Sequence, residues 1–211
     1  MAALTALCLP AADTAHGART KEWTKKPKKE IVIVHSRFVV GPKVTAGLAA
    51  GKLADTLQGA KNTLMYGAGV LVEYCPRLRS RLGLSAELAS FRSRKFKFEH
   101  KDGSARMLSF GASYLVLASP RNRSSLYGRV EFGYVSAKLT NPPFASPHAY
   151  PSFRMGLGHM HYSGARTATR LELYYKRVYT ADERFDFAGE SYLLDFNASY
   201  FALEFSLTFS L

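Results

Sequence analysis

The sequence predicts one all-β domain folded as a closed, antiparallel, up-and-down β-barrel of eight strands. Three observations support this prediction. The last eleven residues alternate strictly between large apolar and small or polar side chains. The same two-residue period recurs backward through the chain to about residue 43, and the connections between the periodic runs alternate between short and long. Because successive side chains of a strand point to opposite faces, each run has one apolar and one polar face.

The expected strands follow in order along the chain. The first seven cover residues 43–51, 63–75, 81–90, 106–118, 126–138, 152–162 and 167–179. The third strand starts near Arg81 and loses its alternation near Ser90 and Phe91, which predicts a β-bulge there. The eighth strand ends at Leu211, and its start is left open as far back as Ser191.

The connections between these strands fall into two length classes. Residues 75–80, 119–124 and 163–166 are short, whereas residues 52–62, 93–105, 139–151 and 180–190 are longer. In an up-and-down barrel, alternate connections lie at opposite ends. We therefore expect tight turns at one end of the barrel and long loops at the other.

The residues before the barrel have a different composition. Residues 1–17 are predicted to be a truncated signal peptide, and residues 18–42 a basic linker or periplasmic segment that precedes the barrel at 43–211. Residues 31–40 could be an extra strand, an extension of the first strand or a plug. Removal of the signal peptide would leave Cys75 as the only cysteine, so we expect no intrachain disulfide and no cysteine metal site.

The charge and hydropathy of the chain exclude two classes of protein. The net charge is +13, but the basic residues fall mostly between strands and no nucleic-acid-binding motif is present, so we expect no nucleic-acid partner. No apolar run reaches 18 residues, so the chain has no candidate transmembrane helix. A closed barrel can also cross a membrane, because all its backbone groups are hydrogen-bonded internally.

The two faces of the strands indicate which side meets lipid. Eight charged residues of both signs share the glycine- and serine-rich face, and the opposite face is apolar and aromatic. A soluble lipocalin-like barrel, the alternative, would need its charges outside. We predict that these eight residues form an interior salt-bridge cluster: Glu73, Glu87, Arg129, Glu131, Arg170, Glu172, Lys176 and Glu204.

The alternating strands and unequal connections of residues 43–211 resemble the small, porin-like β-barrel proteins of the bacterial outer membrane. The resemblance implies a multi-pass protein of the bacterial cell outer membrane, with envelope lipids as partners and the barrel assembly machinery as a partner during biogenesis. The terminal strand usually ends in an aromatic residue in that family. This chain ends in Leu211, with Phe209 two positions earlier on the same face.

Three functions stay open at this point. The first is a structural or surface-interaction role with no catalytic activity. A lipid A deacylase-like enzyme is the second, because His161 and Ser163 are similar to the His-x-Ser pair of that barrel family and a histidine can activate a serine nucleophile. The third is a narrow channel through the charged interior. No cofactor and no metal site is expected, since His159 and His161 lack an obvious third ligand.

Two basic regions are candidate lipid contacts. Arginines cluster in the short connections, where they could meet phospholipid head groups: Arg77, Arg79, Arg81, Arg121, Arg123 and Arg166. The long connection after the third strand could hold lipopolysaccharide phosphates through five basic residues, interleaved with phenylalanines: Arg92, Arg94, Lys95, Lys97 and Lys101. The alternative is a solvated extension of the strand.

Overall fold

The computed structural model describes residues 36–50, 64–98, 101–139, 144–145, 149–179, 183–187, 190–194 and 199–211. These residues form β-strands and their connections. The strands are β1 (Phe38–Ala50), β2 (Leu64–Arg77), β3 (Ser80–Phe98), β4 (Lys101–Leu117), β5 (Ser124–Leu139), β6 (Phe144–Ala145), β7 (Tyr150–Tyr162), β8 (Thr167–Val178), β9 (Glu183–Phe187), β10 (Glu190–Leu194) and β11 (Ser199–Ser210).

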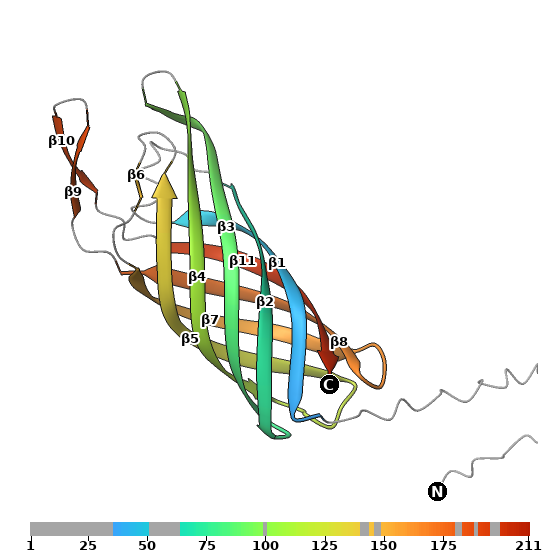
Figure 1. Ribbon diagram of the computed structural model, residues 1–211. Coiled ribbons are helices and arrows are strands. Elements are labelled where there is room, and N and C mark those ends of the chain that lie inside the picture. The colour runs from blue at the N-terminus through green and yellow to red at the C-terminus, as the bar shows by residue number, and fades with distance from the viewer. Residues whose placement is uncertain are drawn as a thin grey trace, which may run out of the picture. The chain divides into compact units, whose positions relative to one another are not determined.

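Eight of these strands close into a barrel. The order around the wall is β1, β2, β3, β4, β5, β7, β8 and β11, and every neighbouring pair is antiparallel (Figure 1). The last strand returns to the first, because β11 pairs with β1 from Val39 opposite Ser210 to Ala50 opposite Ser199. The predicted eight-stranded up-and-down barrel is therefore confirmed, and closure leaves the wall without an unpaired edge.

The first barrel strand begins earlier than expected. The strand β1 starts at Phe38, so residues 38–42 belong to the barrel wall and not to the basic linker. Of the three alternatives for residues 31–40, the part from residue 38 onward extends the first strand. The expected signal peptide and the remainder of the linker lie outside the described residues and stay predictions.

The connection expected at residues 93–105 is instead largely strand. The strands β3 and β4 continue to Phe98 and Lys101 and stay paired, so they form a long hairpin that extends beyond the neighbouring strands (Figure 1). Its register shifts between Ser93 and Lys97, a few residues beyond the bulge predicted near Ser90. The alternation itself continues through Phe91, which is buried at an inward position of β3. The sequence indicated a break there because a large apolar side chain takes an inward position that small or charged residues occupy earlier in the strand.

Two other connections on the same end also contain strands. The short β6 pairs with the end of β5, and β9 pairs with β10 as a separate hairpin. The last barrel strand begins at Ser199, so the alternative start at Ser191 is wrong: that residue belongs to β10.

The burial of the side chains alternates along each barrel strand. Large apolar residues point outward from every strand, among them Leu84, Leu157 and Leu173, each more than half exposed. At mid-height of the wall, charged and small residues point inward, as the sequence predicts, whereas Arg106, Lys138 and Arg177 are exposed near the loop end. Outward aromatic pairs such as Phe38 with Tyr74 lie near the strand ends. No helix among the described residues is long and apolar enough to cross a membrane.

Inward glycines make room for the carboxylates of the interior. A Cβ added at Gly156 would lie 2.5 Å from Glu172 Oε1, whereas one added at Gly128 on the outer face would meet only Leu157 Cδ2 at 3.8 Å. We expect Gly156→Ala to lower the free energy of unfolding by about 1–3 kcal/mol through overpacking, and Gly128→Ala to leave it unchanged. Urea titrations followed by circular dichroism would measure both. Equal stability of the two variants would contradict the close fit around Glu172.

Candidate functional site

The middle of the barrel interior is filled by ionised side chains. Six cations and five carboxylates are buried there among the described residues. They come from seven of the eight wall strands and comprise Lys43, Arg81, Arg129, Arg154, Arg170, Lys176, Glu73, Glu87, Glu131, Glu172 and Glu204. Because an unpaired buried charge is very costly, opposite charges must lie within contact of one another in such an interior.

The carboxylate of Glu204 is the centre of the larger ionic cluster. Its oxygens lie 3.2 Å from Lys43 Nζ, 3.4 Å from Arg129 Nη1 and 2.8 Å from Arg154 Nη1. Arg154 also donates to Glu172 over 2.5 Å, and its guanidinium stacks 3.6 Å from the centre of the Tyr174 ring. These contacts cross the barrel, so they tie several strands of the wall together.

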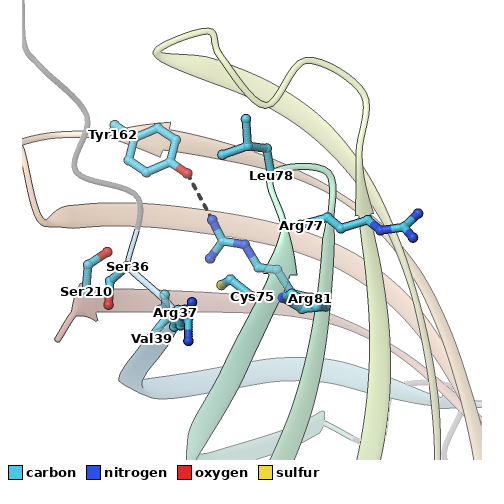
Figure 2. A pocket seen from close by; sticks show the side chains of 10 residues that line it. Ser36, Arg37, Val39, Cys75, Arg77, Leu78, Arg81, Tyr162 and Ser210 are labelled. Carbon is cyan, nitrogen blue, oxygen red and sulfur yellow. Dashed lines mark hydrogen bonds between the residues drawn. The ribbon is translucent and has the colours of Figure 1, made fainter.

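A second ionic cluster lies toward the short turns. Both terminal nitrogens of Arg170 donate to Glu73, over 2.6 Å each, in a bidentate pair. Arg81 Nη1 lies 3.3 Å from Glu73 Oε2, and Arg81 Nη2 donates to the hydroxyl of Tyr162 over 2.9 Å. Figure 2 shows Arg81 pointing across the mouth of the barrel toward Tyr162. Arg81 was expected in a turn at the head groups; it faces inward because it continues the alternation of β3.

Apolar side chains fill the interior on both sides of the ionic layer. Toward the loops the cluster includes Met65, Phe91, Met107, Tyr174 and Tyr200. Toward the short turns it consists of Leu115, Leu117, Tyr127, Met160, Tyr162 and Ala168. Tyrosine hydroxyls connect these layers to the charges, since Tyr127 donates to Glu172 over 3.1 Å. An eight-stranded barrel leaves space only for such side chains.

All eight residues predicted for the interior cluster are buried within the barrel. Three partners are missing from that set: Lys43, Arg81 and Arg154. The alternation of the sequence could have found each of them, because Lys43, Arg81 and Arg154 stand next to the outward-facing Val44, Leu82 and Met155. Lys43 and Arg154 carry much of the positive charge around Glu204.

The structure does not pair His161 with Ser163. The Nδ1 atom of His161 lies 2.7 Å from Ser124 Oγ on the neighbouring strand, whereas Ser163 Oγ contacts Thr167. His161 and Ser124 are directly opposite in the register of β5 and β7. Among the described residues, no Asp or Glu hydrogen-bonds to His161. The predicted catalytic pair is thus replaced by a cross-strand serine–histidine contact at the short-turn end.

The basic residues predicted to hold lipopolysaccharide lie in the β3–β4 hairpin. Lys97 is opposite Asp102 and Lys101 is opposite Phe98 in the backbone register. Lipopolysaccharide binding by this hairpin stays a prediction. In the described part of the chain, no group of three His, Cys, Asp or Glu side chains could hold a metal ion.

Comparison with solved structures finds proteins of similar fold. Neisserial surface protein A has a TM-score of 0.59 at 10% identity, over 83% of this chain and 98% of that chain. The outer membrane protein OprG from Pseudomonas aeruginosa has a TM-score of 0.51 at 10% identity, over 84% of this chain and 97% of that one. The fold is that of the eight-stranded outer-membrane β-barrels.

An outer-membrane barrel fold agrees with the distribution of side chains described above. The soluble lipocalin-like alternative needs charges on the outside and an apolar centre, which is the reverse of the observed arrangement. No protein-family profile and no curated protein sequence matches this chain. Barrels of this fold have unrelated activities, so function must be argued from the particular residues.

Proposed function

We propose that this protein is an integral outer-membrane protein of a bacterial envelope whose filled barrel anchors surface loops for interaction outside the cell. One observation carries the proposal: the outer wall is apolar on every strand, while the ionised residues pair inside. Water outside such a wall would leave a large contiguous apolar surface exposed. A bilayer removes that cost, and its core tolerates a barrel because no backbone group is left unpaired.

The ends of the barrel give the proposed orientation. The short turns face the periplasm, and the long β3–β4 hairpin with the β9–β10 hairpin face the outside, as in barrels of this type. The extended hairpin offers backbone and side chains beyond the wall for contacts with surface molecules. The barrel itself then serves as the anchor.

The interior favours an anchor over a channel. Ion pairs such as Glu204 with Arg154 span the centre, and apolar clusters lie on either side of them. An ion entering this interior would have to displace buried, hydrogen-bonded charges, at a cost of several kcal/mol.

Reconstitution into lipid vesicles and planar bilayers tests the proposal. We expect the folded protein to stay with the vesicles through washes that strip peripheral proteins, and to give no unitary conductance in planar bilayers. A folded protein that remains in the aqueous fraction without detergent would overturn the membrane assignment. Reproducible single-channel steps would instead support the channel alternative.

A further inference from the structure

Arginine is the only exposed charged residue type at the short-turn end of the described barrel. Six arginines are exposed there, on the three short turns and just before β1: Arg37, Arg77, Arg79, Arg121, Arg123 and Arg166. The described aspartates and glutamates lie inside the barrel or in the connections at the opposite end. The short-turn end therefore carries six positive charges with no exposed carboxylate side chain among the described residues.

Two of these arginines line the same recess from different turns. Arg79 of the β2–β3 turn and Arg121 of the β4–β5 turn surround a hollow of about 490 Å³ together with Leu78, Ser119 and Asn122. The two turns are fixed to each other, because the Leu117 amide donates to the Arg79 carbonyl over 2.8 Å. Neither guanidinium has an ion-pair partner among the described residues.

The recess lies where the apolar wall of the barrel ends. Leu78 in the recess and Val116 and Leu126 beside it are all exposed and apolar. Figure 2 shows the Arg77 side chain directed away from the mouth of the barrel, whereas Arg81 points across it. Charged side chains at this boundary lie at the level of lipid head groups when the wall above them is in hydrocarbon.

Like charges that are not paired within a protein favour an anion from outside. The planar guanidinium group matches phosphate with two parallel hydrogen bonds, and it loses less hydration energy than an ammonium group. Two arginines, a serine and an asparagine line this one recess, and their side chains carry donors for the oxygens of one phosphate diester. The apolar Leu78 can contact the glycerol and acyl carbons that follow it.

We propose that the recess between Arg79 and Arg121 binds the phosphate of an anionic phospholipid of the periplasmic leaflet. The other exposed arginines raise the local concentration of the same lipids around the rim. This inference rests on the proposed membrane placement, and it adds a specific lipid site to it.

The test compares bound lipids in nanodiscs that contain both phosphatidylcholine and phosphatidylglycerol. Native mass spectrometry of the full chain is expected to show retained phosphatidylglycerol in preference to phosphatidylcholine. The R79Q/R121Q variant is expected to lose about 30-fold in relative affinity for phosphatidylglycerol, from the loss of two charges near the lipid surface. The R106Q/K138Q variant removes two exposed charges from the loop side and should keep the preference.

The outcomes separate this inference from the proposed function. A chain that folds but does not enter bilayers overturns both. A chain that enters bilayers but retains the two lipids equally, or whose R79Q/R121Q variant keeps the preference, overturns the lipid site alone. Displacement of phosphatidylglycerol by inorganic phosphate as readily as by a soluble short-chain phosphatidylglycerol also overturns it, because the site would then be one for free phosphate.

Discussion

Replacing Arg170 by methionine is expected to lower the free energy of unfolding by about 3–5 kcal/mol. The Arg170 guanidinium is buried and bonds both oxygens of Glu73 over 2.6 Å. Its loss leaves the Glu73 carboxylate in the interior with Arg81 as its remaining partner, at 3.3 Å. Removing one partner of a buried pair costs more than the pair contributes, because the other charge stays buried and under-compensated.

A double variant distinguishes this cause from simple loss of packing. E73Q/R170M removes both charges, so we expect it to be more stable than R170M alone. K138Q, at an exposed position, should change stability by no more than about 0.5 kcal/mol. Urea titrations of the wild type, E73Q, R170M and E73Q/R170M in lipid vesicles would give the four unfolding free energies of a double-mutant cycle. Additive effects of E73Q and R170M would contradict the bidentate pair.

Placing an arginine on the outer wall is expected to be costly at mid-height and tolerated near the rim. Leu173 is in the middle of β8 and is 57% exposed, and Leu126 is near the short-turn end of β5 and is 66% exposed. In a bilayer, L173R should lose about 2–4 kcal/mol of stability, whereas L126R should lose about 0–1 kcal/mol. The difference arises because a charge at the bilayer centre is deprived of water.

L173R and L126R differ only in the height of the substituted residue on the outer wall. Both changes replace an exposed leucine on a strand by arginine, so the effects of strand propensity and side-chain volume on stability are the same in the two variants and cancel in the comparison. On a wall surrounded by water both substitutions would cost little. Equal costs for the two variants in lipid vesicles would therefore contradict a wall that crosses a membrane.

The sequence predicted the wall of the barrel well because a two-residue period is a local property. Outward Leu171 and Leu173 alternate with inward Arg170 and Glu172 over a few residues, so the strand and its apolar face can be assigned without any distant contact. The prediction failed where composition concealed the period. Closely spaced basic residues after Phe91 led to a predicted long connection at residues 93–105, yet β3 continues to Phe98 by pairing with β4.

The sequence by itself determined the eight strands of the barrel wall, the apolar face of those strands and the charged character of the interior. Only the tertiary structure decided the partners, such as Glu73 with Arg170 at a separation of 97 residues, and His161 with Ser124 in place of Ser163. It also brought Arg79 and Arg121 from two turns to one recess. The reason is physical: alternation fixes which face a residue occupies, but strand register and barrel closure fix which residue lies opposite it.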